Sequence, residues 1–442
     1  MHQSMKKVLI VTYYFPPSGG PGVQRVLKFV KYLPESGWQP VVLTVQDGDY
    51  PARDESLLAE IPKHAIVYRT KIFEPYRLYR RLTGKAPNAP VDVENIPQGG
   101  GGKSLAEGIA EFIRSTFFIP DARLGWYPYA ISEGLEIIRR ERIDAIYSSS
   151  PPYTTALIAR KLARTAKLPW IAGFRDPWTG FLSTPQRWFF PAAIDRYLEA
   201  SVFRDAKLVE AAWRGILKDI LKKIPDLDRQ KLIYLPNGFD GEDYPNVSPR
   251  TDGIFTITYT GSMYGKRNPR TFLRAVEELV REKRVERENI RLKFIGRFGA
   301  EVNEMLRSSS LGDRIEIISY LPHSRSVEEL LLADALLLIV DEANGSEEIV
   351  PGKVFEYLGA GRPIIALAPE GAIADLMRET KAGIVAPNRD IAAIQSAFVE
   401  CYENFVYHST KIQPDRDAIL RYDRREITRN LAVLLDSIIP QH

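Results

Sequence analysis

The stretch KVLIVTYYFPPSGGPGVQRVLKFVKYL, residues 7–33, contains in order a short apolar run, a loop rich in Pro and Gly, and an amphipathic segment. Residues 7–12 have the length of a buried strand, and the Pro and Gly residues that follow them mark a turn. From Val23 onward the apolar residues recur with the period of a helix, and another apolar run follows at residues 41–45. This order predicts a β-α-β unit and therefore a mostly parallel sheet with helices on both faces.

Two series of alternating strands and helices extend this pattern along the chain. The first series is interrupted at residues 47–102, where Pro, Gly and charged residues dominate, and the second begins at residue 255. Strands are predicted at residues 145–148, 170–173, 208–210, 231–235, 255–259, 291–295, 315–318, 335–339, 363–366 and 383–385. Helices are predicted at residues 105–115, 131–139, 154–165, 192–204, 271–282, 302–309, 327–332, 354–360, 391–401 and 424–439.

The predicted fold class is therefore α/β, with two doubly wound, Rossmann-like domains facing a central cleft. We predict that residues 1–240 form the N-terminal domain and residues 250–415 form the C-terminal domain. The helix at residues 424–440 is expected to pack back on the N-terminal domain. Doubly wound sheets bind ligands outside the carboxyl ends of their strands. The loops that follow the strands are therefore the first places to search for a site.

The composition is that of a soluble globular protein. Hydrophobic residues make up 45% and charged residues 26% of the 442 residues, which excludes a disordered chain or a fibrous repeat. The net charge of +4 is too small to indicate nucleic-acid binding. The single cysteine, Cys401, allows no internal disulfide and fits a reducing compartment. No apolar run is long enough to span a bilayer, so we expect a cytoplasmic protein and leave attachment to a membrane surface open.

Some short motifs fit ordinary structural roles better than functional ones. The run PQGGGGKS at residues 97–104 resembles a phosphate-binding loop, but Pro97 replaces the first Gly of that motif and no buried strand leads into it. The sequence Asp226-Leu227-Asp228 has the D-x-D form of metal-dependent sugar transferases, yet it lies in a charged stretch and favours a solvated loop. The sequence contains no HExxH motif, CxxC motif or histidine cluster, so we expect no metal site.

Two glycine-containing turns have the composition of an anion site. The first, SGGPG at residues 18–22, lies between the first strand and the first helix, where backbone N–H groups and the helix N-terminus favour an anion. An ordinary tight turn is the alternative. The second, TGSMYGKRNP at residues 260–269, directly follows a strand and combines a glycine turn with Lys266 and Arg267. This combination suits a diphosphate, and a solvated basic turn is the alternative.

A further cluster lies at residues 347–363, EEIVPGKVFEYLGAGRP. Pro351-Gly352 indicates the start of a helix, so Glu348 is expected on the preceding loop and Glu356 about one turn into the helix. The N–H groups at the helix N-terminus lie between these two carboxylates and can bind an anion. The carboxylates can then accept hydrogen bonds from hydroxyls on both sides of a diphosphate, as in a nucleotide sugar. Helix capping by Glu348 alone is the alternative.

In this order, the elements resemble the retaining GT-B glycosyltransferases of bacterial surface-polysaccharide and lipopolysaccharide synthesis, the family 4-like, group 1 enzymes. The matching segments are the opening strand with its glycine loop, Arg175-Asp176-Pro177-Trp178, Pro236-Asn237-Gly238-Phe239-Asp240, Tyr259-Thr260-Gly261-Ser262 and the pair of glutamates in E-x7-E spacing. The resemblance covers nearly the whole chain and is least clear at residues 47–102. It implies a GT-B fold and a metal-independent transferase.

The resemblance also implies roles for individual residues. Glu348 is expected near the hydroxyls of the transferred sugar, and Glu356 at the ribose of the nucleotide. Lys266 or Arg267 is expected to stabilise the departing diphosphate, and Asp176 to be the carboxylate on the acceptor side. The predicted donor-binding residues are Gly20, Gly22, Arg175, Gly261, Ser262, Gly296, Arg297, Phe298, Leu321, Val350, Lys353 and Glu356.

The chain departs from the family pattern at three places, which leave the donor sugar open. Many relatives carry His where Phe174-Arg175-Asp176 lies, so Arg175 or Asp176 is expected to replace the usual histidine contact. The first basic position after the glycine turn is usually Arg, but Ser262-Met263 stand there. The usual E-G-x-G before the helix is Glu348-Ile349-Val350-Pro351.

The resemblance implies a nucleotide diphosphate sugar as co-substrate, no other cofactor, and a lipid-linked or glycan acceptor. Basic and aromatic residues interleave at residues 71–85, and RWFFP at residues 187–191 is predicted to be an apolar loop. Either segment suits a membrane interface, and folding against the first domain is the alternative. We therefore expect a cytoplasmic protein that can be peripheral on the inner face of the membrane, with no nucleic-acid partner.

Three other functions stay open at this point. A nucleotide-sugar epimerase has the same architecture but needs a general acid and base and no acceptor site. A non-catalytic nucleotide-sugar or glycan-binding protein binds the donor without turnover. A P-loop NTPase depends only on residues 99–104 and is the weakest alternative.

Overall fold

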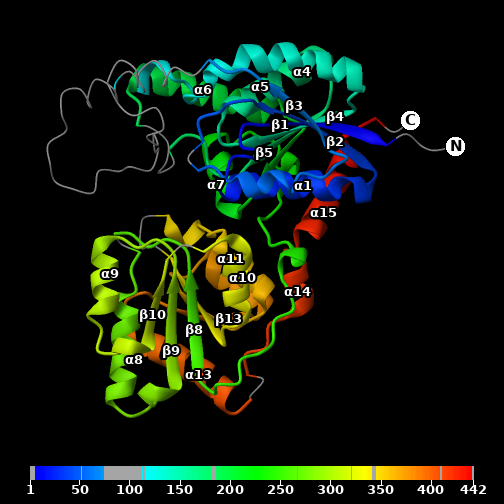
Figure 1. The fold of residues 1–442 in the computed structure, drawn as a ribbon. Coiled ribbons are helices and arrows are strands. Elements are labelled where there is room, and N and C mark those ends of the chain that lie inside the picture. The colour runs from blue at the N-terminus through cyan, green and yellow to red at the C-terminus, as the bar shows by residue number, and fades with distance from the viewer. Residues whose placement is uncertain are drawn as a thin grey trace. The chain divides into compact units, whose positions relative to one another are not determined.

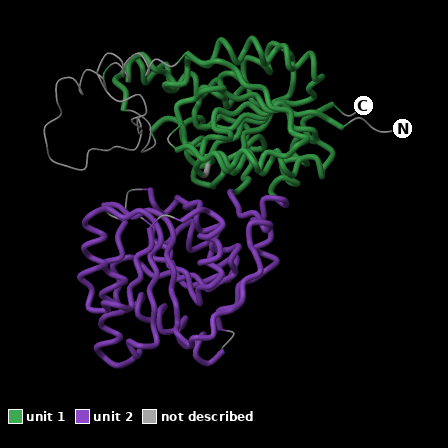
Figure 2. Tube along the Cα trace, in the orientation of Figure 1, with its two compact units in different colours: residues 1–236, 427–442 green, residues 237–426 purple. Residues whose placement is uncertain are grey.

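The computed structural model describes residues 5–50, 52–73, 112, 115–180, 186–265, 267–319, 321–340, 345–408 and 411–440. The chain divides into two compact units (Figure 2). Unit 1 contains residues 1–236 and 427–442, and unit 2 contains residues 237–426. Each unit is built on one parallel sheet flanked by helices (Figure 1).

Unit 1 has a seven-stranded parallel sheet in the order β3-β2-β1-β4-β5-β6-β7. The strands are β1 (Lys6–Thr12), β2 (Trp38–Val45), β3 (Ile66–Thr70), β4 (Ala145–Ser150), β5 (Trp170–Phe174), β6 (Leu208–Ala211) and β7 (Leu232–Tyr234). Every residue of β4 and β5 is buried, as expected of central strands covered on both faces. The strand order reverses between β1 and β4, which places a topological switch point at their carboxyl ends.

Helices cover both faces of this sheet (Figure 1). They include α1 (Pro21–Tyr32), α4 (Tyr127–Glu141), α5 (Thr154–Ala166), α6 (Phe189–Asp205), α7 (Arg214–Lys223) and α15 (Arg424–Ile438). On one face, Val26 and Val30 of α1 share an apolar core with Leu431 and Leu435 of α15 and with Ile10 of β1. Because residues four apart lie on one side of a helix, α15 packs most of its apolar stripe into unit 1.

Unit 2 has a six-stranded parallel sheet in the order β10-β9-β8-β11-β12-β13. The strands are β8 (Phe255–Thr260), β9 (Ile290–Ile295), β10 (Ile315–Ile318), β11 (Ala335–Ile339), β12 (Ile364–Leu367) and β13 (Gly383–Ala386). Its helices include α8 (Arg270–Arg281), α9 (Ala300–Arg307), α10 (His323–Leu331), α11 (Lys353–Ala360), α12 (Ala372–Thr380), α13 (Ile391–Val406) and α14 (Arg416–Leu420). Successive residues of β11 enter opposite cores, Leu337 the one with α8 and α13 and Leu338 the one with α11 and α12.

The structure confirms the predicted fold class, α/β with two doubly wound, Rossmann-like sheets. Sequence patterns missed four of the described strands and α-helices, β3, α7, α12 and α14. Strand β3 lies within the predicted interruption at residues 47–102 and is only half-buried along most of its length, so it lacks a continuous apolar run. The helix predicted at residues 105–115 and the glycine run at residues 97–104 lie wholly or mostly outside the described residues.

The prediction of a loop at residues 187–191 was wrong, because α6 already begins at Phe189. Pro191 lies in the first turn of α6, where a helix does not need the backbone N–H that Pro lacks. Several other helices also begin earlier than predicted. Helix α4 begins at Tyr127 and α10 at His323, because their first turns are polar or aromatic and do not show the apolar period.

Candidate functional site

The carboxyl ends of the strands are the expected ligand edge of each sheet. The switch point lies between β1 and β4 in unit 1, and between β8 and β11 in unit 2. Most of the predicted site residues follow one of these strands or a direct neighbour of one. Residues 20–22 follow β1, Arg175 and Asp176 follow β5, residues 261–267 follow β8, and residues 348–356 follow β11.

In unit 2, a lysine at the start of one helix reaches the glycine turn after another strand. Lys353 begins α11, and its Nζ donates to Tyr259 Oη (2.7 Å) and to the carbonyl oxygen of Thr260 (2.9 Å). The ammonium group also lies 4.2 Å from the centre of the Tyr259 ring. Gly261 has a φ of +111°, and a Cβ atom at this position would lie 2.7 Å from Nζ of Lys353. Glycine is therefore required between the end of β8 and this ammonium group.

The position of Lys353 is electrostatically unfavourable for its own helix. A helix N-terminus carries a partial positive charge, so a cation in the first turn is repelled unless nearby acceptors or an anion compensate. Gly352, the N-cap of α11, provides no side-chain hydrogen bond. Tyr259 and Thr260 supply two acceptors to the ammonium group. The positive charge of Lys353 and of the helix end together suit a bound anion.

The two predicted glutamates lie on either side of this helix start, as the sequence pattern indicates. Glu348 ends a short 3-10 turn (Ser346–Glu348), and Glu356 lies in the first turn of α11. Oε1 of Glu356 lies 3.5 Å from Nε2 of His323, the first residue of α10. Sequence reasoning missed His323, because only the fold brings it to Glu356. Its side chain is 49% exposed, so both groups are accessible to a ligand.

The loops after β8 and β9 are held together by backbone hydrogen bonds. The N–H of Met263 donates to the carbonyl oxygen of Arg297 (3.1 Å), and the N–H of Gly299 donates to that of Met263 (3.0 Å). A Cβ atom at Gly296 would lie 2.1 Å from the carbonyl oxygen of Gly261, so the two turns touch. One loop cluster thus contains five predicted donor-binding residues, Gly261, Ser262, Gly296, Arg297 and Phe298.

The remaining predicted residues of unit 2 lie outside this loop cluster. Arg267 is partly buried, and its backbone N–H donates to the carbonyl oxygen of Tyr264 (3.1 Å). Leu321 is partly buried and lies just before α10. Val350 packs against the apolar core of α11 and α12, so its side chain contributes to packing. Lys266 lies outside the described residues.

In unit 1, an arginine from the loop after β5 lies against the first turn of α1. Nη1 of Arg175 donates to Ser149 Oγ (2.5 Å), and Nη2 donates to the carbonyl oxygen of Pro151. A Cβ atom at Gly22 would lie 3.2 Å from Cζ of Arg175. Burial lowers the pKa of Arg175, and the charge of Asp176 opposes this shift. The group nevertheless stays charged at neutral pH, because an arginine side chain is not deprotonated in proteins.

The start of α1 has no side-chain cap and no acidic residue in its first turn. Gly20, the N-cap, has a φ of +97°. The positive end of α1 and the Arg175 guanidinium therefore lie next to each other. This arrangement is the counterpart in unit 1 of the Lys353 site in unit 2.

Buried polar contacts fix the loop that carries Arg175. Nε1 of Trp178 donates to Asp195 (2.9 Å), and Oγ1 of Thr179 donates to Glu199 (2.5 Å). Both acceptors lie on α6, and burial raises the pKa of each carboxyl group. Sequence reasoning missed these two carboxylates. They act as anchors of the loop rather than as exposed site residues.

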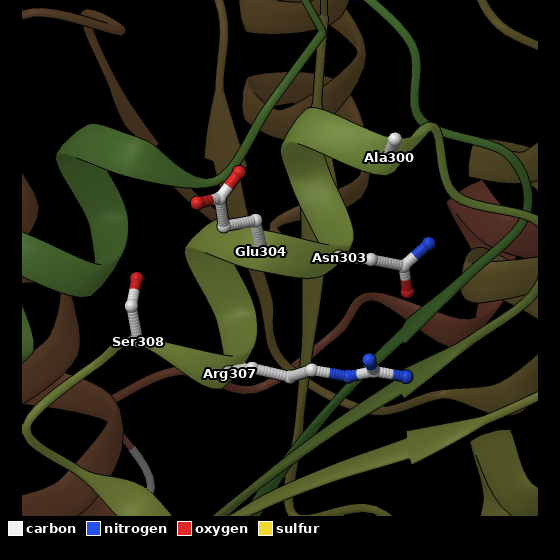
Figure 3. A pocket seen from close by; sticks show the side chains of 5 residues that line it. All are labelled: Ala300, Asn303, Glu304, Arg307 and Ser308. Atoms are coloured by element: carbon white, nitrogen blue, oxygen red, sulfur yellow. The ribbon is translucent and has the colours of Figure 1, made fainter.

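A surface hollow of about 550 Å³ lies on α9 and contains none of the predicted residues (Figure 3). Its lining residues are Ala300, Asn303, Glu304, Arg307 and Ser308. Asn303 Nδ2 donates to the carbonyl oxygen of Phe298 (2.8 Å) and so supports the loop after β9. The hollow itself presents no group of residues that points to a reaction.

Two further observations concern metals and membranes. Across the part of the chain that the structure describes, no group of three His, Cys, Asp or Glu side chains could hold a metal ion. In the same residues, no helix combines the length and apolarity needed to cross a bilayer. The Asp226 side chain is 74% exposed, and Asp228 accepts from the backbone N–H of Gln230 (2.9 Å), as expected of a solvated loop.

Solved structures with the same two-unit architecture are known. Anabaena HepE, solved in complex with UDP, superposes with a TM-score of 0.63 at 13% identity, over 98% of this chain and 100% of that one. The lipopolysaccharide outer core galactosyltransferase WaaB gives 0.57 at 12% identity, over 97% and 99%. The UDP-GlcNAc 2-epimerase of Neisseria meningitidis, bound to UDP-GlcNAc, gives 0.52 at 13% identity, over 98% and 100%. At these identities the likeness concerns the GT-B fold alone.

Matches to family models show which proteins of this fold the chain belongs with. Residues 19–238 match the glycosyl transferase 4-like domain, and residues 254–404 match the glycosyl transferases group 1. The chain belongs to the group 1 glycosyltransferases of the GT-B fold. No curated protein matches the sequence.

Proposed function

We propose that this protein transfers a sugar from a nucleotide diphosphate sugar to an acceptor hydroxyl, with retention of the anomeric configuration and without a metal ion. The observation that carries the proposal is the contact of Lys353 with the glycine turn at Gly261. A diphosphate bound there is stabilised by the ammonium group and by the N-terminus of α11. The UDP complex of HepE supports a nucleotide donor of this kind.

We assign the donor-side roles in unit 2 from the resemblance to the family and from the contacts of Lys353. Glu356 holds the ribose hydroxyls, and Glu348 holds hydroxyls of the transferred sugar. Lys353 stabilises the departing diphosphate together with Lys266 and Arg267, and this electrostatic stabilisation provides most of the catalysis. The loop cluster after β8 and β9 frames the nucleotide through its backbone.

The reaction exchanges one bond at the anomeric carbon for another. The bond from this carbon to the phosphate oxygen of the donor breaks, and its electron pair leaves with the diphosphate. The acceptor oxygen bonds to the same face of the sugar, so the configuration is retained. Asp176, on the acceptor side in unit 1, takes the proton of the acceptor hydroxyl.

Substitution of Lys353 tests the donor site. Lys353→Met removes the charge but keeps the length of the side chain, and we expect a loss of about 100-fold or more in kcat/KM for nucleotide release. The matched control is Lys411→Met, also in unit 2, because the Lys411 side chain is 65% exposed and lies outside the candidate site. NMR of the product gives its anomeric configuration. Undiminished turnover in the Lys353 variant, or an inverted product, would contradict the proposal.

The likeness of the fold to an epimerase supports one rival function. An epimerase converts the donor sugar itself and needs no acceptor. NMR of the sugar nucleotide after incubation without acceptor separates the two activities, because a transferase leaves the donor sugar unchanged. Donor binding without either reaction would instead indicate a non-catalytic binding protein.

We propose further that the reaction takes place in cell-surface glycan synthesis, on a lipid-linked or glycan acceptor at the inner face of the membrane. Exposed aromatic side chains along the first half of α6 support this. Phe189 is 81% exposed, Tyr197 is 70% exposed and Phe190 is 58% exposed. Aromatic side chains of this kind favour the headgroup region of a bilayer. Of the other predicted membrane segment, residues 71–85, only the first three residues are described.

Vesicle flotation tests this membrane surface. We expect the double variant Phe189→Ser/Phe190→Ser to bind vesicles of anionic phospholipid at least about fivefold more weakly than the unmodified protein. Tyr407→Ser is the matched control, because Tyr407 is 75% exposed but belongs to unit 2. Equal flotation of both variants, or no flotation of the unmodified protein at low salt, would contradict membrane attachment through α6.

A further inference from the structure

The Arg175 guanidinium is held in place by the protein but is not neutralised by it. The two oxygen atoms that accept its hydrogen bonds, Ser149 Oγ and the carbonyl oxygen of Pro151, carry no formal charge. Among the described residues, no carboxylate oxygen lies within 4.0 Å of the guanidinium nitrogens. Asp176 influences the group only from a greater distance. Of the five N–H groups of an arginine, these two acceptors use only two.

A buried arginine of unit 1, Arg25, shows the contrast. Arg25 is 2% exposed and pairs with Glu210 at 2.6 Å between Nη2 and Oε1. Arg187, in the same unit, pairs with Asp195 at 2.8 Å. Burying an arginine charge without such a partner is costly. Arg175 is only partly exposed and has no such partner among the described residues, so an anionic ligand would supply a compensation that the protein does not.

The surroundings of Arg175 also favour an anion over a neutral group. The guanidinium lies 3.2 Å from the position a Cβ atom would occupy at Gly22, in the first turn of α1. Both the helix end and the side chain are positive. Ser149 and Pro151 fix the plane of the guanidinium, and the contacts of Trp178 and Thr179 with α6 fix the loop behind it. A fixed planar fork binds a carboxylate or a phosphate through paired hydrogen bonds.

We propose that unit 1 binds an oxyanion of a substrate, the carboxylate of an acidic sugar or a sugar phosphate, on Arg175 beside Gly22. This inference rests on the proposed function only in naming the ligand as a substrate. A neutral sugar cannot satisfy the guanidinium to the same extent, because its hydroxyls carry no charge. Arg175 therefore gives an acidic substrate a higher affinity than a neutral one.

Calorimetric titration of the full chain tests this site. The probes are glucose, glucuronate and glucose 6-phosphate, added in the presence of UDP, which occupies the proposed diphosphate site in unit 2. We expect one of the two anionic probes to bind at least about tenfold more tightly than glucose. Preference for glucuronate identifies a carboxylate as the ligand group, and preference for glucose 6-phosphate identifies a phosphate. Equal affinity for all three probes would overturn the proposal.

Variants test whether Arg175 causes the tighter binding of the anionic probe. Arg175→Gln should abolish the difference in affinity between that probe and glucose. Arg175→Lys keeps the charge but not the fork, and should retain only part of this difference. Arg164→Gln is the matched control in unit 1, because that side chain is 65% exposed. Gly22→Ala is a second variant in case Arg175→Gln does not fold. It keeps the charge but crowds the guanidinium, and should also weaken the preference.

The result separates this inference from the proposed function. If UDP binds but no probe shows a preference that depends on Arg175, the oxyanion site is wrong and the transfer of a sugar can still hold. If UDP does not bind but an anionic probe binds through Arg175, the site holds and a uridine nucleotide is excluded as the donor. A preference that survives Arg175→Gln would overturn the assignment to Arg175.

Discussion

The first six strands of unit 1 have the same order as the six strands of unit 2, but the two units hold their candidate site cations in different ways. In unit 1, Arg175 comes from a loop that buried contacts fix, and two acceptors set the plane of its guanidinium. In unit 2, Lys353 extends from a helix start across the Tyr259 ring to the end of β8. Arginine presents a rigid fork, whereas lysine presents a point charge on a flexible stem. We infer that Arg175 in unit 1 recognises an anion by its planar geometry. Lys353 in unit 2 can instead shift its ammonium group as negative charge develops on the departing diphosphate.

The two units also differ in the residues that their first helices bury. The first helix of unit 1, α1, buries Arg25, which pairs with Glu210 (2.6 Å) and also donates to the carbonyl oxygen of Pro236 (2.7 Å), the last residue before unit 2. The first helix of unit 2, α8, buries only apolar residues such as Phe272 and Val276. The first helix of unit 1 therefore adds a buried charge pair to its apolar packing, whereas the first helix of unit 2 is buried by apolar packing alone.

The largest expected effect comes from breaking this charge pair. Arg25→Met leaves the Glu210 carboxylate buried without its partner, which should lower the free energy of unfolding of unit 1 by about 3–5 kcal/mol. All six tryptophans lie in unit 1, so tryptophan fluorescence in a urea titration reports on this unit alone. Arg139→Met, at an exposed position of α4, is the matched control.

A double variant distinguishes a buried charge from lost packing. If the unpaired Glu210 causes the loss, Arg25→Met/Glu210→Met should recover part of it, because neither charge is then buried. A double variant that is less stable than Arg25→Met would contradict this explanation. It would indicate instead that Glu210 stabilises unit 1 even without Arg25, through the hydrogen bond that it accepts from Tyr147 Oη (2.9 Å).

A smaller effect is expected from crowding the cation of unit 2. In Gly261→Ala, the new Cβ atom would lie 2.7 Å from Nζ of Lys353, and the φ of +111° is strained for any other residue. We expect UDP to bind about tenfold to hundredfold more weakly in calorimetric titration. Gly253→Ala is the control for strain alone, since Gly253 has a φ of +66° but no atom within 4 Å of the added Cβ. Equal losses in both variants would mean that Lys353 does not contribute.

Local sequence patterns predicted the parts of the site that depend on local structure. Pro351-Gly352 indicated the start of α11 and so the placement of Glu348 and Glu356 on either side of it, because helix starts have local signals. The contact of Lys353 with Thr260 joins residues far apart in the chain, and no local pattern contains it. The anchors Asp195 and Glu199 were missed for the same reason.

The smallest expected effect tests whether the two units respond separately. Cys401 is the single cysteine and lies in the apolar core of unit 2, where burial raises the pKa of its thiol to about 12. The thiolate is the reactive form, so labelling at pH 8 requires unit 2 to open. In Arg25→Met, we expect the labelling rate of Cys401 to stay within about twofold of the unmodified protein, because only unit 1 loses a stabilising pair. Acceleration by the factor that corresponds to the loss in unit 1 would show instead that the units unfold together, and that the charge pair of unit 1 also stabilises the apolar core of unit 2.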